Sequence, residues 1–132
     1  MMEQIYEFLK NSGVYYLATV ESDQPRVRPF GTIDLFEGRL YIQTGKSKAV
    51  AQQMKANPKV ELSAMSKDGK WIRVCAEAVL DENIKAQAHM LDAYLDLKAM
   101  YQPGDGNTEV YYLINGKAQI CAFADAPIEI TF

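Results

Sequence analysis

Short runs of β-forming residues, separated by tight-turn residues, recur along this chain and limit its fold more than any other feature. The runs occupy residues 14–20, 26–36, 39–44, 60–65 and 71–80. Turn residues separate them, among them Glu37-Gly38 and the Asp68-Gly69 pair. Runs of this length between Gly, Asp, Asn and Pro residues are typical of antiparallel strands. The pattern therefore predicts a mainly β fold.

The last third of the chain permits two interpretations. Residues 110–114 and 118–123 are apolar runs with Asn115-Gly116 between them. Asn-Gly between apolar runs is a strong hairpin signal. One long bulged strand is the competing interpretation. Residues 124–132 are expected to form a tail with some strand character.

Helices are expected only at a few connections. Helical spacing of apolar residues predicts one helix over 3–11, another that ends before Pro58, and a third over 83–95 with a stripe of Ala88, Leu91 and Leu95. With 132 residues, the chain fits one domain, 1–132. Strands that dominate, with a few helices at the connections, predict a small β-barrel with helices packed outside it.

Charge and composition exclude several classes of protein. The net charge of −3 argues against a general nucleic-acid binder. No apolar run is long enough to span a membrane and the N-terminus lacks a signal pattern, so we expect a cytoplasmic protein without a membrane partner. A single histidine and two separated cysteines exclude a zinc cluster. Cys75 and Cys121 are expected to be buried reduced thiols.

The stretch 41–58 carries the most distinctive chemistry. It is expected to contain a strand end, a tight turn and a short helix, with Thr44, Lys46, Ser47 and Lys48 where the helix begins. A helix N-terminus already carries partial positive charge and free N–H donors, so two lysines there favour a bound anion such as phosphate. The alternative is a Ser-capped helix with two solvated lysines.

A second basic segment, Arg26-Val27-Arg28-Pro29, lies on the preceding strand. Alternation places both arginines on one face and Val27 on the other. Pro29 cannot donate a ladder hydrogen bond, which predicts an edge or a bulge. Pairing outward from Glu37-Gly38 would bring residue 26 near residue 49, where an arginine would join the lysines in phosphate chemistry.

No catalytic machinery of the protein's own is evident. Ser47 at a helix start is typical of a cap, and His89 has no acidic or thiol partner in a recognisable motif, which favours packing or surface exposure. Trp71 opens a strand, where it either covers the core or presents a flat face to an aromatic ligand. An enzyme of this composition would need a cofactor to carry its reaction.

Four blocks of sequence resemble the pyridoxamine 5′-phosphate oxidase-like flavoproteins. These blocks are Leu-Ala-Thr-Val (17–20), Gln-Pro-Arg-Val-Arg-Pro-Phe-Gly (24–31), the stretch 44–60 from Thr44 to Val60, and Trp-Ile-Arg-Val-Cys-Ala-Glu-Ala (71–78). The block 24–31 and the block Gly-Lys-Ala-Gln-Ile-Cys-Ala-Phe (116–123) are most similar to the short nitroimidazole-resistance-type members. The resemblance implies an FMN-binding split β-barrel of six to seven antiparallel strands with Greek-key connections and a few peripheral helices.

The resemblance also implies a homodimer with FMN at the subunit interface. By position, Arg26 and Lys48 would hold the FMN phosphate, and Lys46 would replace the charge of the arginine that relatives carry where this chain has Ser47. The remaining residues implied at the flavin are Val27, Arg28, Pro29, Gln43, Thr44, and Trp71 and Arg73 from the partner subunit.

Three functional hypotheses follow. The first is an FMN-dependent oxidoreductase acting on a small organic substrate, nitroaromatic compounds included. The second is a non-catalytic FMN-binding carrier, electron-transfer protein or redox sensor, and the third is a different ligand, such as a deazaflavin or a tetrapyrrole, in the same fold. True pyridoxine-phosphate oxidation is not expected, because Gly31 stands where those enzymes carry lysine.

Overall fold

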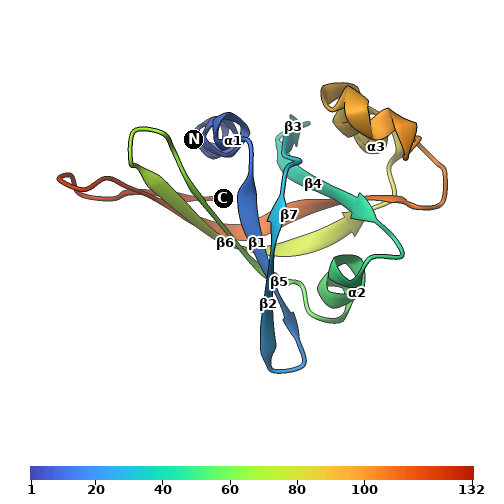
Figure 1. Cartoon of the computed structure of the whole chain (residues 1–132), viewed down its shortest axis with the longest axis horizontal. Coiled ribbons are helices and arrows are strands. Elements are labelled where there is room, and N and C mark those ends of the chain that lie inside the picture. Colours follow the sequence, from blue (N-terminus) through green and yellow to red (C-terminus); the bar gives the residue numbers. More distant parts are fainter.

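One antiparallel sheet of eight strands dominates the computed structural model, which describes all residues 1–132 (Figure 1). The strands are β1 (Tyr15–Glu21), β2 (Gln24–Phe30), β3 (Asp34–Phe36), β4 (Arg39–Gly45), β5 (Lys59–Met65), β6 (Trp71–Asp81), β7 (Thr108–Cys121) and β8 (Ile128–Thr131). The helices are α1 (Met2–Ser12), α2 (Ala49–Ala56), α3 (Ile84–Ala93) and the 3₁₀ helix η1 (Leu95–Ala99). None of the helices combines the length and the apolar character needed to cross a membrane.

The strand order is β2-β1-β5-β6-β7-β4-β3, with β8 paired to β7. Strands β5, β6 and β7 are successive neighbours, and the earlier strand β4 pairs with β7, which is Greek-key connectivity. The end strands β2 and β3 do not pair with each other, so the barrel stays open. The expectation of a mainly β split barrel is confirmed. Eight strands are present instead of six to seven, because the run 26–36 breaks into β2 and β3 and the tail forms β8.

The core lies on the inner face of the sheet, beneath α1 and α2. Its fully buried members include Ile5 and Leu9 of α1, Leu17 of β1 and Met54 of α2. Helix α2 contacts β1, β4 and β6, which holds its N-terminus beside the end of β4 (Figure 1). The outer face of the sheet carries the alternate residues of the same strands, so its side chains meet solvent.

The segment around Asn115-Gly116 is a bulge inside one strand, so the hairpin interpretation is wrong and the long bulged strand is confirmed. β7 runs without a break from Thr108 to Cys121, and its register with β6 shifts between Cys75 and Glu77. Asn115 has φ +52°, and the Gly116 N–H donates to the carbonyl oxygen of Phe132 across 2.8 Å. Pairing of β7 with β6 on one side and β8 on the other leaves no room for a turn.

The expected pairing of residues 26–36 with 39–44 is confirmed only for residues 34–36 with 39–41, and it is wrong for the rest of the run. Pairing across Glu37-Gly38 ends at Asp34 and Tyr41, and β2 instead pairs with β1, where Arg26 lies opposite Thr19. β2 is an edge strand, which is the position that Pro29 predicts. Position 26 is therefore not brought to position 49 by a hairpin.

Two expectations about burial need correction. On α3 the buried residues are Ala86, Gln87, Met90 and Leu91, so only Leu91 of the expected apolar stripe is buried. Both cysteines are free thiols, but Cys75 is exposed and Cys121 half-buried. Cys75 is exposed because odd-numbered positions of this part of β6 face outward, away from the core.

Candidate functional site

A cavity of about 270 Å³ lies where β2, β4, the start of α2 and the segment after α3 meet. Arg28 comes from β2, Gln43 and Thr44 from the end of β4, and Lys48 from the start of α2. The remaining lining residues are Pro29, Phe30, Gly31, Thr32, Val50, Leu97, Met100 and Tyr101. The two charged side chains in the lining are both cations. No carboxylate, imidazole or thiol lines this cavity.

Hydrogen bonds fix the guanidinium of Arg28. It donates to the Leu17 carbonyl oxygen (3.2 Å), the Thr19 hydroxyl (2.7 Å) and the Gln53 amide oxygen (2.6 Å). Burial, followed by the nearby charge of Arg26, lowers the pKa of Arg28. Its intrinsic pKa is so high that it stays protonated near neutral pH. Arg28 is therefore a pre-oriented cation at the cavity.

The start of α2 is a helix N-terminus whose cap does not come from a side chain. Lys48 is the N-cap residue with extended backbone (φ −76°, ψ 149°), and the first turn contains no acidic residue. Ser47 precedes the cap, so the Ser-capped alternative is not what the structure shows. Neither Lys46 nor Lys48 takes part in an ion pair. Unpaired lysines beside free N–H donors suit an anion.

Gln43 and Thr44 form a buried polar floor at the end of β4. The Gln43 backbone N–H donates to the Thr32 hydroxyl (3.1 Å), and that hydroxyl donates to the Gln43 carbonyl oxygen (3.3 Å). The Gln43 side-chain amide donates to the Thr44 carbonyl oxygen (3.2 Å). The two bonds between Thr32 and Gln43 join the bend after β2 to strand β4. The β2 side and the β4 side of the cavity are therefore held in fixed positions relative to each other.

The other predicted site residues lie elsewhere. Arg26 forms an ion pair with Glu21 (3.0 Å), and Val27 faces outward with 67% of its surface exposed. Trp71 and Arg73 share the outer face of β6, where the Arg73 guanidinium lies 5.2 Å from the Trp71 ring centre. The structure thus brings together Arg28, Pro29, Gln43, Thr44 and Lys48, and it leaves outside this cavity Arg26, Val27, Lys46, Ser47, Trp71 and Arg73.

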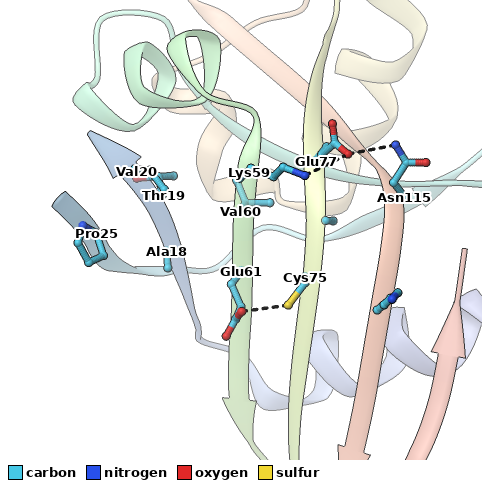
Figure 2. Close-up of a pocket in the computed structure, with 12 residues that line it drawn as sticks. Ala18, Thr19, Val20, Pro25, Lys59, Val60, Glu61, Cys75, Glu77 and Asn115 are labelled. Carbon is cyan, nitrogen blue, oxygen red and sulfur yellow. Dashed lines mark hydrogen bonds and ion pairs between the residues drawn. The ribbon is translucent and has the colours of Figure 1, made fainter. Parts of the chain in front are cut away.

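A second hollow, of about 360 Å³, lies on the outer face of the sheet (Figure 2). Its polar groups pair with one another: Lys59 with Glu77 (3.6 Å), and Asn115 with Glu77 (3.1 Å). The Cys75 thiol donates to Glu61 (3.0 Å), and that bond raises the pKa of Cys75. A thiol held in its protonated form is a poor nucleophile, so this hollow offers no activated nucleophile.

His89 is half-exposed and packs against Phe36, as expected from sequence, but it also has an acidic partner that no local motif contains. Its Nδ1 lies 2.6 Å from the carboxylate of Asp34, a buried residue of β3, and its ring lies 4.6 Å from that of Phe36. Neither residue lines the cavity. The pair joins α3 to β3 across 55 positions of sequence, which no local motif reveals.

Sequence reasoning also missed Gln53 and the segment after α3. Gln53 of α2 is only 7% exposed and accepts from both Arg28 and Thr19. The signal that could have revealed Gln53 is its position: it is a polar residue on the core-facing side of the helix, beside Val50 and Met54. Leu97, Met100 and Tyr101 reach the cavity through tertiary packing, and their sequence pattern carried no comparable signal.

Comparison with known proteins agrees with this architecture. The family model described as pyridoxamine 5′-phosphate oxidase matches residues 1–122. A NimC/NimA family protein from Clostridium acetobutylicum is 44% identical in sequence, with a TM-score of 0.96 over 99% of this chain and 92% of that chain. Among curated proteins no match was found.

More distant solved structures share the fold alone. General Stress Protein 26 from Bacillus anthracis is 19% identical, with a TM-score of 0.74 over 100% of both chains. A heme binding protein from Mycobacterium smegmatis is 14% identical, with a TM-score of 0.73 over 96% of this chain and 57% of that chain.

The open antiparallel barrel defines a split-barrel protein. Together with the match over residues 1–122 and the relative at 44% identity, it shows that the chain belongs to the pyridoxamine 5′-phosphate oxidase-like family, within its NimC/NimA group. Members of this family commonly bind a flavin and are typically dimers. The fold of this chain is one that flavin-dependent oxidoreductases use.

Proposed function

We propose that this protein binds FMN in the cavity between β2, β4 and α2, and that it is an FMN-dependent oxidoreductase acting on small organic molecules, nitroaromatic compounds among them. One observation carries the proposal: the unpaired Lys48 at the α2 N-terminus shares a cavity with the pre-oriented Arg28. An arginine and a lysine beside free helix N–H groups suit a phosphate. When bound, FMN would supply hydride or electron exchange with the substrate.

Each residue of the site has a proposed role. Lys48 and Arg28 hold the phosphate end. Lys46, Ser47 and Arg26 do not line the cavity, and any donors they supply would reach the phosphate only from its rim. The backbone at Val27 and Pro29, with Gln43 and Thr44, lines the flavin ring. The chain's own contribution to the reaction is to bind, orient and exclude water, because no carboxylate or imidazole lines the cavity.

We further propose that the working unit is a homodimer in which Trp71 and Arg73 reach the partner's FMN. Both residues lie on the outer face of β6, away from their own chain's cavity. That outer face exposes Tyr16 (54%), Val27 (67%) and Met65 (67%), apolar surface that a second copy would bury. The cavity of about 270 Å³ is smaller than the roughly 300–1,000 Å³ of typical ligand pockets. A second copy that adds walls to the cavity would enlarge the site to the size a ligand needs.

Sedimentation velocity tests the dimer. The wild type is expected to sediment as a dimer, and Met65→Asp is expected to shift it toward the monomer by placing a charge in the interface. A wild type that stays monomeric with FMN present would contradict the proposal.

The lack of an acid or base in the cavity also favours a second candidate, a non-catalytic FMN carrier, electron-transfer protein or redox sensor. The two candidates differ in turnover. Reduced, FMN-loaded protein mixed with nitroaromatic compounds, quinones and azo dyes is reoxidised rapidly by at least one of them if the protein is an oxidoreductase. A carrier or sensor transfers electrons to none of these compounds at an appreciable rate.

Mass spectrometry of the ligand released from purified protein on denaturation tests the proposed cofactor. The expected mass is that of FMN. A deazaflavin or a tetrapyrrole would contradict the FMN assignment while leaving the cavity as the binding site.

A further inference from the structure

The segment 94–101, between α3 and β7, gives the cavity an apolar wall. Leu97, Met100 and Tyr101 line the cavity together with Arg28 and Lys48. Met100 is 68% exposed, which is high for a large apolar side chain. The cavity therefore combines cations supplied by β2 and α2 with apolar groups supplied by the 94–101 segment.

Both ends of this segment are held against the barrel. The Tyr94 hydroxyl donates to the Ile33 carbonyl oxygen (3.0 Å) and accepts from the Ile33 N–H (2.9 Å). At the other end, Tyr101 is buried against Gly45, and its hydroxyl oxygen lies 2.9 Å from the place that a Cβ of residue 45 would occupy. Leu97 and Met100 are thus presented to the cavity by a supported segment.

The charged groups of the segment do not face the cavity. Asp96 and Lys98 are absent from the lining, and the Lys98 ammonium lies 2.6 Å from Asp92 in an ion pair. A charged substituent placed against Leu97 and Met100 would lose water without gaining a partner from the 94–101 segment. A neutral aromatic ring would gain from burial, and a methionine side chain adapts readily to such a ring.

We propose that the 94–101 segment forms the substrate side of the site and selects uncharged, planar aromatic substrates over anionic ones. The inference rests on the proposed FMN function, because FMN in the cavity would neutralise Arg28 and Lys48 and leave the apolar wall to face the substrate. Leu97 and Met100 are the specificity-determining residues.

The test compares two variants that each introduce one lysine into the 94–101 segment, at different positions. Met100→Lys puts a cation on the wall, and Leu95→Lys puts one on the same segment at a residue that is 67% exposed and does not line the cavity. FMN is first titrated into each protein. The dissociation constants of 1,4-naphthoquinone and 1,4-naphthoquinone-2-sulfonate are then measured by calorimetry on the three FMN-loaded proteins.

The wild type is expected to prefer the neutral quinone, and Met100→Lys to lower that preference about fivefold, the effect of one partly exposed ion pair. Leu95→Lys is expected to leave the preference unchanged. An equal preference in all three proteins, a similar change in Leu95→Lys, or a wild type that prefers the sulfonate would overturn the inference. If these outcomes accompany normal FMN binding, the proposed function survives. Absence of FMN binding in every protein would overturn both.

Discussion

Arg28 on β2 and Gln53 on α2 are joined by a 2.6 Å hydrogen bond from the guanidinium to the side-chain amide oxygen. The hydroxyl of Thr19 on β1 donates to the same oxygen, across 2.5 Å. Gln53 thereby connects three elements behind the cavity. The cation that faces the proposed phosphate and the helix that supplies Lys48 are fixed relative to each other by this one amide.

Replacing Gln53 is expected to destabilise the protein. Gln53→Leu keeps a similar volume but removes the acceptor of the Thr19 hydroxyl and one of the three acceptors of Arg28, which costs about 1–3 kcal/mol of the free energy of unfolding. Urea denaturation measures the loss. Gln52→Leu, on the exposed neighbour, is the matched control and is expected to change stability by less than about 0.5 kcal/mol. Equal losses in the two variants would contradict the role of Gln53.

Arg28 is expected to matter more than Arg26 for FMN binding. Arg26 is half exposed and already paired with Glu21, whereas Arg28 faces the cavity with Lys48. Loss of a charge-assisted hydrogen bond in Arg28→Ala weakens FMN binding by about tenfold or more. Arg26→Ala is expected to have a smaller effect. Fluorescence titration gives both dissociation constants. A larger loss of FMN affinity in Arg26→Ala than in Arg28→Ala would indicate that Arg26 binds the phosphate instead.

Gly116→Ala is expected to destabilise the β7–β8 pairing. A Cβ at this position would lie 2.0 Å from the Phe132 ring, so the ring or the strand must move, at a cost of about 1–3 kcal/mol. A double-mutant cycle with Phe132→Ala measures the clash, because Gly116→Ala should cost much less when the ring is absent. Additive effects of the two substitutions would show that the ring is not the obstacle.

Asp105 is expected to make the folded state sensitive to acid. Backbone N–H groups, that of Thr108 first and those of Gln102 and Asn107 after it, lower the pKa of Asp105 to about 2. A carboxyl whose pKa is lower in the folded state stabilises it above the unfolded pKa, roughly 3.9, and loses that contribution as pH falls toward the folded value.

Asp105→Ala therefore isolates this contribution. The stability difference between wild type and variant should be largest above about pH 5 and should shrink between about pH 4 and pH 2. Urea midpoints measured across this range provide the comparison. A difference that stays constant below pH 4 would contradict the assignment of the lowered pKa.

The strands and turns follow from local chemistry, which is why they could be predicted from sequence. The alternation of Arg26, Val27 and Arg28 predicted that the two arginines share one face of the strand and Val27 lies on the other. Pro29 predicted that β2 is an edge strand. Pairing partners depend on the whole sheet. The partner of β2 was therefore mistaken, and the bulge at Asn115 was left undecided between two interpretations.

The candidate site divides in the same way. Lys48, Gln43 and Thr44 belong to one continuous stretch, so their neighbourhood was readable from their spacing. Gln53 and Met100 join them only through packing of α2 and the 94–101 segment against the barrel. Asp34 and His89 are equally remote in sequence, and a local pattern has no means of pairing them.

The central claim is that the cavity with Lys48 at the α2 N-terminus holds the phosphate of FMN. The direct measurement is an equilibrium titration of ligand-free protein with FMN, followed by flavin fluorescence, for the wild type, Lys48→Glu and Lys67→Glu. Lys67 is exposed in the β5–β6 turn outside the cavity, so its variant makes the same change of charge elsewhere. We predict binding by the wild type and Lys67→Glu and a loss of at least about tenfold in Lys48→Glu, where repulsion replaces attraction. Equal FMN affinity in all three proteins would contradict the claim.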